Sequence, residues 1–327
     1  MGKIAGLLND ACNERDRLGV EPGLAVRTLA AGDGWAVEDV VCTYRPSDAS
    51  FEERHARYRV ALVGAGTFNC RGPHGRELLT PGSLLIGNVG EGFECGHEHG
   101  TGDRCLAFAY ERELFERLAF EAGVRGKPRL KSLRVPPVRA LAPLVADACA
   151  AWRTTAMDGG SAENAGRNFR PTAMDGGTPS ASAWDEVAVR LAAAAARFAG
   201  APTRTPRSPR NAERGVVRAV RLIERDVSQR LELDELAREA SLSRFHFVRA
   251  FALATGLTPH RYVLRARLRR AAVRLATNDA RVVDVAIASG FRDVSNFNHA
   301  FRAEFGTTPR AHRRSAERRG DERIVPN

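Results

Sequence analysis

The sequence predicts an α+β protein with a β-rich N-terminal part and an all-α C-terminal part. In residues 1 to about 110, short apolar runs alternate with turns that contain Gly and Pro, which is typical of a β-sandwich or barrel. In the last third, one helical motif occurs twice, 50 residues apart. Residues 211–327 hold 23 arginines against 14 acidic residues, so +9 of the net charge of +11 lies there.

Three apolar runs indicate strands in the N-terminal part, namely Tyr58–Val63, Leu84–Ile86 and Cys105–Tyr110. We interpret Gly64-Ala-Gly66 between them as a hairpin turn, because the third glycine of a dinucleotide-binding loop is missing. In the last run, the alternation of apolar residues favours Leu106, Phe108 and Tyr110 facing the interior.

Alternating cysteine and histidine side chains precede the last run. Phe93, Cys95, His97 and His99 would share one face of a strand, and Cys105 begins the next strand. A two-residue turn pairs His97 with Leu106, and a three-residue turn pairs it with Cys105. Apolar patterning favours the first register, so we expect a polar hairpin with no metal and no cofactor. The alternative is a Zn²⁺ site formed by Cys95, His97, His99 and Cys105.

The region between the two parts has helical apolar spacing in Glu113–Phe120, in Val138–Trp152 and again around residues 184–198. The segment Thr155-Ala-Met-Asp-Gly-Gly160 repeats at Thr172–Gly177 among small and polar residues, which predicts a disordered insertion near 153–183. The Pro- and Arg-containing stretch 200–211 is interpreted as an interdomain linker.

Cysteine usage and the lack of long apolar segments predict a soluble cytoplasmic protein. All six cysteines precede residue 150 without a spacing typical of disulfides. No apolar run is long enough for a signal peptide or a membrane span.

The repeated motif predicts two helix-turn-helix units. Phe247-x3-Phe251-x4-Gly256-x-Thr258-Pro259 recurs as Phe297-x3-Phe301-x4-Gly306-x-Thr308-Pro309. Ser243 and Asp293, which can each cap a helix, lie four residues before the first Phe of their copy. The two Phe of each copy share a buried face of the helix. Short helices beginning near Leu233 and Val283 precede the caps, and in such motifs the second helix enters the DNA major groove.

Helical geometry separates inward from outward positions on the two recognition helices. Arg249 suits guanine and Asn298 suits adenine, whereas Phe245 or Val248 could touch a thymine methyl group. The predicted base-reading residues are Phe245, Val248, Arg249, Val294, Ser295, Asn298 and His299. The predicted contacts to the DNA backbone are Arg244, Arg302, Arg310, Arg313 and Arg314.

The segment from about Arg214 to Arg314 resembles the DNA-binding domain of the AraC/XylS family of transcription regulators. The stretch Asp284-Val-Ala-Ile-Ala-Ser-Gly-Phe-Arg-Asp-Val-Ser-Asn-Phe-Asn-His-Ala-Phe-Arg-x3-Gly-x2-Thr-Pro carries the likeness. The resemblance implies two helix-turn-helix units on one linker helix, predicted from Pro259 to Ala276. On that helix, Tyr262, Leu268 and Leu275 are candidate core positions. Five arginines, Arg269 among them, form its polar side.

The N-terminal part, through Pro81-Gly82-Ser83-Leu84-Leu85-Ile86, is similar to the cupin-like sensing domain of that family. The resemblance implies a small-molecule effector inside the barrel, a homodimer formed through the intermediate helices, and activation beside RNA polymerase. The candidate wall residues are His55, Tyr58, Phe93, His97 and Phe108. The predicted boundaries are 1–125 for sensing, 126–199 for dimerisation, 200–211 for the linker, 212–315 for double-stranded DNA binding and 316–327 for a polar tail.

We therefore expect a non-enzymatic, ligand-responsive DNA-binding regulator that reads two successive major grooves per monomer. Two alternatives stay open from the residues. One is a metal-dependent cupin-type enzyme fused to a DNA-binding domain, and the other is a constitutive DNA binder whose barrel only dimerises.

Overall fold

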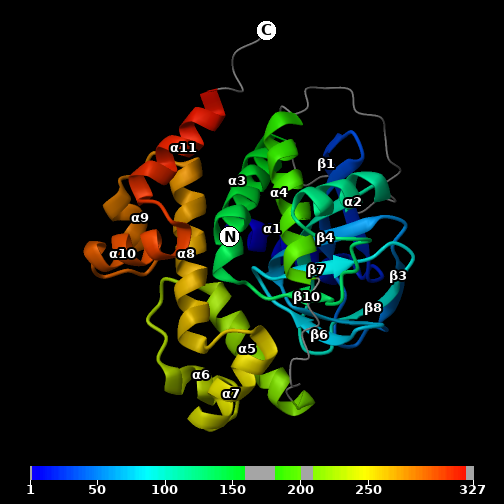
Figure 1. Ribbon diagram of the computed structural model, residues 1–327. Coiled ribbons are helices and arrows are strands. Elements are labelled where there is room, and N and C mark those ends of the chain that lie inside the picture. The colour runs from blue at the N-terminus through cyan, green and yellow to red at the C-terminus, as the bar shows by residue number, and fades with distance from the viewer. Residues whose placement is uncertain (1, 159–180, 200–208, 322–327) are drawn as a thin grey trace. The chain divides into compact units, whose positions relative to one another are not determined.

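The computed structural model describes residues 2–158, 181–199 and 209–321 (Figure 1). Among these residues, one compact unit comprises 2–136 with 155–158 and 181–199, and a second comprises 137–154 with 209–321. The predicted insertion near 153–183 and the linker 200–211 lie largely outside the described residues. The predicted polar tail 316–327 is described to residue 321, where it is helical. The α+β fold class is confirmed, because two sheets form the first unit and helices form the second.

The β-rich unit is a sandwich of two antiparallel sheets. The larger sheet has the strand order β1-β2-β9-β4-β7-β10 and the smaller has the order β3-β8-β5-β6. The strands are β1 Leu24–Gly32, β2 Trp35–Cys42, β3 Phe51–Arg54, β4 Tyr58–Gly66, β5 Phe68–Gly72, β6 Gly75–Leu79, β7 Leu84–Gly87, β8 Gly92–Gly96, β9 Asp103–Tyr110 and β10 Arg134–Val135. Three helices belong wholly to this unit: α1 Gly2–Leu18, α2 Arg112–Glu121 and α4 Ala181–Ala199.

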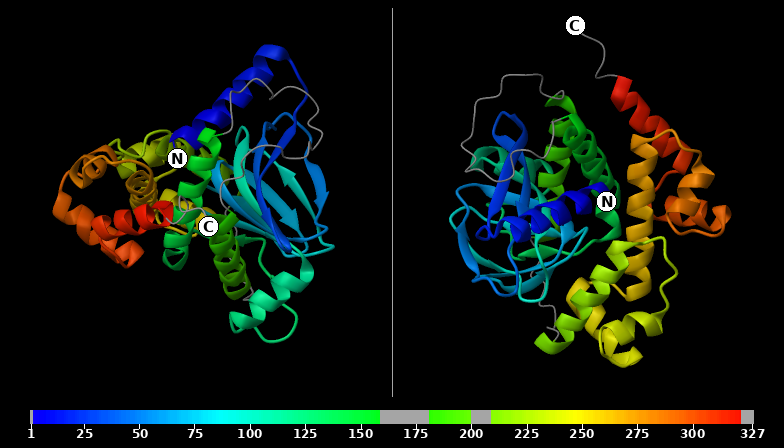
Figure 2. Two further views of the ribbon diagram at one scale, coloured as in Figure 1. Left: turned by 90° about the horizontal axis from the view of Figure 1, so that it is seen from above. Right: turned by 180° about the vertical axis from the view of Figure 1, so that it is seen from behind.

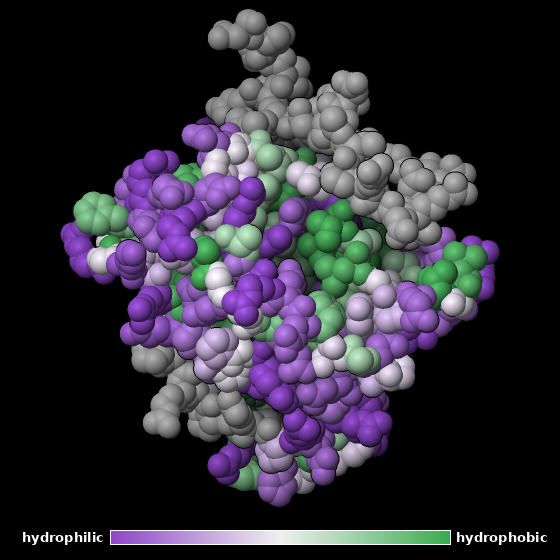
Figure 3. All heavy atoms as spheres, turned by 90° about the vertical axis from the view of Figure 1, so that its right-hand side faces the viewer, coloured by the Kyte–Doolittle hydropathy of each residue, from purple (hydrophilic) through white to green (hydrophobic). Residues whose placement is uncertain are grey.

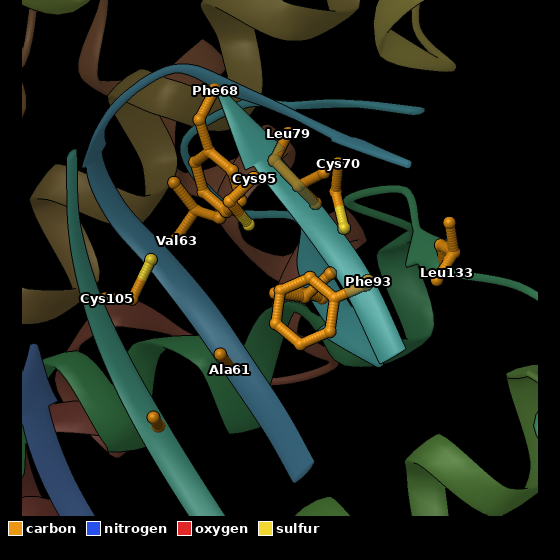
Figure 4. Packing of buried hydrophobic residues seen from close by; sticks show 11 residues of the cluster. Ala61, Val63, Phe68, Cys70, Leu79, Phe93, Cys95, Cys105 and Leu133 are labelled. Carbon is orange, nitrogen blue, oxygen red and sulfur yellow. The ribbon is translucent and has the colours of Figure 1, made fainter. Parts of the chain in front are cut away.

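The core between the sheets is small and apolar (Figure 4). Ala61 of β4 and Cys105 of β9 contribute from the larger sheet, and Phe68, Cys70 and Phe93 contribute from the smaller one. These side chains belong to one buried cluster, so the odd-numbered positions of β4 and β9 face the partner sheet.

The opposite face of the larger sheet is covered by helices. The Phe108 ring lies 6.0 Å from the ring of Trp184 on α4, and the Tyr110 hydroxyl donates to the carbonyl oxygen of Ala188 at 2.8 Å. Leu106, Phe108 and Tyr110 are thus buried as predicted, but they face these helices and not the space between the sheets. Every residue of β9 is buried, so alternation along this strand does not distinguish its two faces.

The predicted hairpin between residues 92 and 110 is wrong in both of its registers. Strand β8 pairs with β3 and β5 in the smaller sheet, whereas β9 pairs with β2 and β4 in the larger sheet. Cys95 therefore lies opposite Cys70, and Cys105 lies opposite Val63. The segment 97–102 crosses between the sheets instead of turning back along one of them.

The first of the predicted wall residues, His55, is buried in the sandwich unit with an apolar environment around its ring. Its ring lies 4.4 Å from the Phe93 ring, and neither ring nitrogen has a hydrogen-bond partner among the described residues. A Cβ atom at Gly87 would lie 2.1 Å from the His55 ring, so glycine is required there. Burial, together with the positive charge of Arg59, lowers the pKa of His55 to about 4.

This histidine makes the stability of the unit depend on pH. Between pH 6.5 and 4, the unfolded chain takes up a proton at His55 that the folded chain does not, so stability falls as the pH falls. From pH 7 to pH 5 the loss amounts to about 2 kcal/mol. Urea unfolding of the parent and of His55→Leu at both pH values measures it. The variant should lose about 2 kcal/mol less, and equal losses would contradict the assignment.

The helical unit is built around the long helix α8 (Figures 1 and 2). Its elements are α5 Arg210–Arg225, α6 Leu233–Glu239, α7 Arg244–Thr255, α8 Pro259–Thr277, α9 Val282–Ala288, α10 Val294–Phe305 and α11 Pro309–Asp321. Residues 137–154, with most of α3 (Ala142–Asp158) and a short 3₁₀ helix at Arg139–Leu141, belong to the same unit. The linker helix thus spans the predicted residues, and Tyr262, Leu268 and Leu275 are buried in it.

Arg269 of α8 is buried, although it was predicted to lie on the polar side of the helix. Arg269 is only 7% exposed, and its guanidinium donates to Glu224 of α5 at 3.0 Å. The Tyr262 hydroxyl donates to the same carboxylate oxygen at 3.0 Å. Arg269 therefore holds α5 against α8, because a buried guanidinium needs a charged partner.

The surface carries hydrophobic residues in separate patches, as Figure 3 shows for one face that is otherwise mainly hydrophilic. Within the part of the chain that the structure describes, no helix combines the length and the apolar character needed to cross a bilayer.

Candidate nucleic-acid interface

The first helix-turn-helix unit consists of α6 and α7. Between them, Ser241 adopts a left-handed conformation (φ 56°) that turns the chain sharply. The Ser243 side chain then accepts from the backbone N–H of His246 and caps α7. Gly256 ends α7 with φ 79°, a left-handed conformation that glycine adopts without steric cost.

The second unit, α9 and α10, repeats this construction with one extra residue in the turn. Gly290 takes the left-handed conformation (φ 91°), and the Asp293 carboxylate accepts from the backbone N–H groups of Ser295 and Asn296. Gly306 ends α10 with φ 73°. Similar local signals therefore begin and end both recognition helices, although the two turns differ in length by one residue.

The phenylalanine pairs fix how each recognition helix is rotated. Phe247 and Phe251 of α7 are fully buried with their ring centroids 5.4 Å apart, and Phe297 and Phe301 of α10 are fully buried at 5.5 Å. Since these residues face the core, the opposite sides of α7 and α10 face solvent.

The predicted base-reading positions lie on those outer sides. On α7, Phe245 is 72% exposed, which is unusual for an aromatic side chain, and Arg249 is exposed while Val248 is half-buried. On α10, Asn298 and His299 are exposed. The remaining two positions, Ser295 (exposed) and Val294 (half-buried), lie in the first turn of α10. The two helices thus present a guanidinium, an amide, an imidazole and a hydroxyl group that can match base edges.

The arginines predicted to contact the DNA backbone fall into two groups. Arg302, Arg310 and Arg314 are exposed. Arg244 forms an ion pair with Asp234 of α6, and Arg313 donates to the carbonyl oxygen of Ala280. Arg313 is half-buried, whereas Arg244 is exposed and its ion pair with Asp234 lies at the surface.

A positively charged groove of about 770 Å³ lies beside the turn of the second unit. Its arginine and histidine side chains, which the sequence reasoning did not select, are Arg230, His260, Arg267 and Arg292. Arg267 is anchored by hydrogen bonds to the carbonyl oxygens of Val227 (2.7 Å) and Gln229 (2.8 Å). Burial lowers the pKa of Arg267, and the nearby charge of Arg292 lowers it further. Only the general excess of arginine could have pointed to this groove, because its walls come from three separate segments.

A family model and several known proteins match parts of this chain. Residues 236–315 match a family model described as a helix-turn-helix domain. The transcriptional regulator Rob of Salmonella typhimurium is 33% identical over 104 residues, 32% of this chain and 36% of Rob. The transcriptional activator AarP of Providencia stuartii is 31% identical over 93 residues, which are 28% of this chain and 69% of AarP. The chain belongs to the AraC/XylS family.

A solved regulator with an AraC-type DNA-binding domain from Chromobacterium violaceum is 28% identical and covers 36% of this chain and 100% of its own, with a TM-score of 0.30. The AraC/XylS relatives are matched only in part, since the chain spans about a third of the length of Rob.

The β-rich unit of this AraC/XylS protein places the candidate effector residues on different faces. Phe93 belongs to the core between the sheets, and the ring of His55 packs on it. Tyr58 stacks on Phe115 of α2 at 4.3 Å, on the helix-covered face that also holds Phe108. Tyr58 and Phe108 therefore do not line the space between the sheets, contrary to the prediction, because both faces of β4 and β9 are buried.

The alternative metal-binding set is not brought together either. Cys95 faces the sandwich core beside Cys70, and His99 lies beyond the end of β8. Cys105 contacts Asp103, with its thiol donating to a carboxylate oxygen at 3.1 Å. His97 alone of the predicted four takes part in a cluster of metal-binding residue types, with partners that the sequence reasoning did not select.

Proposed function

We propose that this AraC/XylS-family protein is a sequence-specific transcription regulator that binds double-stranded DNA and is not an enzyme. The observation that carries the proposal is the pair of capped recognition helices, α7 and α10, each turned so that polar side chains face solvent. Rob and AarP, which are similar to part of this chain, are by name a transcriptional regulator and a transcriptional activator.

In the proposed complex, α7 and α10 enter successive major grooves on one face of the duplex, about 34 Å apart. Arg249 and Asn298 read guanine and adenine through paired hydrogen bonds, and the exposed side chains Arg302, Arg310 and Arg314 bind phosphates. The charged groove with Arg230 and Arg292 adds phosphate contacts beside the second recognition helix.

We further infer a ligand-responsive activator in the cytoplasm. In this proposal, the cupin-like unit binds a small molecule, the intermediate helices pair two subunits, and the bound dimer recruits RNA polymerase. The support is the two-sheet sandwich together with family membership. An effector would act by binding one arrangement of the subunits more tightly than another.

Selection of bound sequences from random DNA tests direct base reading. For Arg249→Ala and Asn298→Ala, we expect one preferred base to be lost in each variant, with affinity for the parent site lower by about 1–3 kcal/mol. Arg225→Ala, at an exposed arginine of α5 outside both recognition helices, is the control and should keep the parent consensus. If both test variants also kept the parent consensus, these two residues would not read bases.

A further inference from the structure

The fold brings together three side chains that are far apart in the sequence. Cys42 ends β2, and Asp103 begins β9 directly opposite it in the larger sheet. His97 follows β8, which belongs to the smaller sheet. The cluster Cys42–His97–Asp103 therefore connects the two sheets at one end of the sandwich.

These side chains are within reach of a single small ion. One ligand atom from each residue (the Cys42 Sγ, a ring nitrogen of His97 and a carboxylate oxygen of Asp103) lies within 4.8 Å of the others. The His97 Nε2 is 2.8 Å from the Asp103 Oδ1. All three residues are buried, with exposed fractions of 3% for Cys42, 4% for His97 and 6% for Asp103.

One buried polar atom of the cluster has no hydrogen-bond partner among the described residues. This atom is the Nδ1 of His97, whose side chain is only 1% exposed. An unpaired buried polar atom costs free energy, so its presence at this position calls for an explanation. The other ring nitrogen, Nε2, faces Asp103, and a cation coordinated there would balance the charge of the Asp103 carboxylate.

The backbone around the cluster is fixed by glycine. Gly102 is left-handed (φ 65°), and its N–H donates to the carbonyl oxygen of Tyr44 at 2.8 Å. A Cβ atom at Gly102 would lie 2.8 Å from the Cys42 carbonyl oxygen, so a side chain does not fit there. The segment that carries His97 and Asp103 is thereby held close to the end of β2. The second Asp103 oxygen accepts from the Cys105 thiol at 3.1 Å, which orients the carboxylate.

The donor set identifies the kind of ion. Thiolate, imidazole and carboxylate are the ligands of Zn²⁺ sites, whereas Ca²⁺ and Mg²⁺ select oxygen ligands. Cysteine binds Zn²⁺ as the thiolate, so the Cys42 thiol must lose its proton when the ion binds.

We propose that Cys42, His97 and Asp103 bind one Zn²⁺ ion, with water in the fourth position, and that this ion ties the two sheets together. The site stabilises the sandwich unit and is independent of the proposed reading of DNA. The set differs from the four residues predicted from the alternating pattern and shares only His97 with them.

The test measures metal content and metal-dependent stability of the full-length chain, purified without metal-affinity chromatography. We expect about one Zn²⁺ per chain by elemental analysis, and a higher melting temperature when Zn²⁺ is added back after chelation. Co²⁺ in place of Zn²⁺ should give a sulfur-to-metal charge-transfer absorption. Cys42→Ser should abolish this band and weaken Zn²⁺ binding by more than about 100-fold, since even the loss of an outer partner costs about 10- to 100-fold.

Cys70→Ser is the matched control, because Cys70 is equally buried in the same sandwich but lies opposite Cys95. It should keep one Zn²⁺ and the Co²⁺ band. Asp103→Asn, which preserves the shape of the side chain, gives a second measurement if Cys42→Ser fails to fold, and it should also weaken binding. The proposal is overturned if the parent chain neither contains nor binds Zn²⁺. It is equally overturned if the Cys42 and Asp103 variants bind as the parent does, or if Cys70→Ser loses the metal too.

Discussion

Replacing Glu224 with alanine is expected to lower the free energy of unfolding of the helical unit by about 3–5 kcal/mol. The change leaves the Arg269 guanidinium, whose side chain is 9% exposed, without its charged partner in the interior. It also removes the acceptor of the Tyr262 hydroxyl. Alanine is a strong helix former, so a loss of helix propensity in α5 does not explain the effect.

The control for this prediction is Glu232→Ala in the same unit. Glu232 pairs with Arg230, but their side chains are 60% and 70% exposed, and such pairs contribute about 0–1 kcal/mol. Hydrogen exchange of the α5 and α8 amides in the full-length chain, followed across a urea series, measures both variants. Similar small losses for the two glutamates would mean that the buried network does not hold α5 on α8.

Gly290→Ala is expected to destabilise the second helix-turn-helix unit by about 2–5 kcal/mol. Part of this, about 1–2 kcal/mol, is the cost of a left-handed conformation (φ 91°) for a residue with a Cβ atom. The rest is steric, because that Cβ would lie 2.8 Å from the Arg267 Nε and 2.9 Å from the Ser228 Cα. Relief of the clash would displace the segment that positions the cap Asp293.

Gly306→Ala separates the two contributions. Gly306 has a similar backbone (φ 73°), but among the described residues beyond its immediate neighbours no atom lies within 4 Å of a Cβ placed there. It should therefore cost only the conformational 1–2 kcal/mol. Thermal unfolding and hydrogen exchange of α9 and α10 give the comparison, and equal effects of the two substitutions would contradict a steric contribution at Gly290.

The helix-turn-helix units could be predicted from the sequence because their signals are local. A cap, two phenylalanines four residues apart and a glycine that ends the helix all act within about fifteen residues, and the chain presents them twice. Which side of each recognition helix faces solvent follows from the same spacing. The role of Arg269 could not be predicted in this way, because its partner Glu224 lies 45 residues away and the charge pattern of α8 alone indicates an exposed residue.

The sandwich was harder to predict for a topological reason. Alternation along a strand shows which residues share a face, but not which sheet the strand joins. The hairpin predicted for residues 92–110 failed on this point, since β8 and β9 belong to different sheets. For the same reason, the partners of His97 in its buried cluster, Cys42 and Asp103, come from the sheet that the local pattern does not indicate.

The continuous helix α8 connects the two proposed recognition helices, and it limits how the sequence of a bound operator can change. Helix α8 runs unbroken from Pro259 to Thr277 with its core side packed, so its length cannot adjust. A base substitution in either half-site removes one contact and leaves the others in register. An inserted base pair rotates one half-site by about a tenth of a turn against the other. DNA sites bound in the proposed way should therefore differ in base sequence but keep the same distance between their two half-sites.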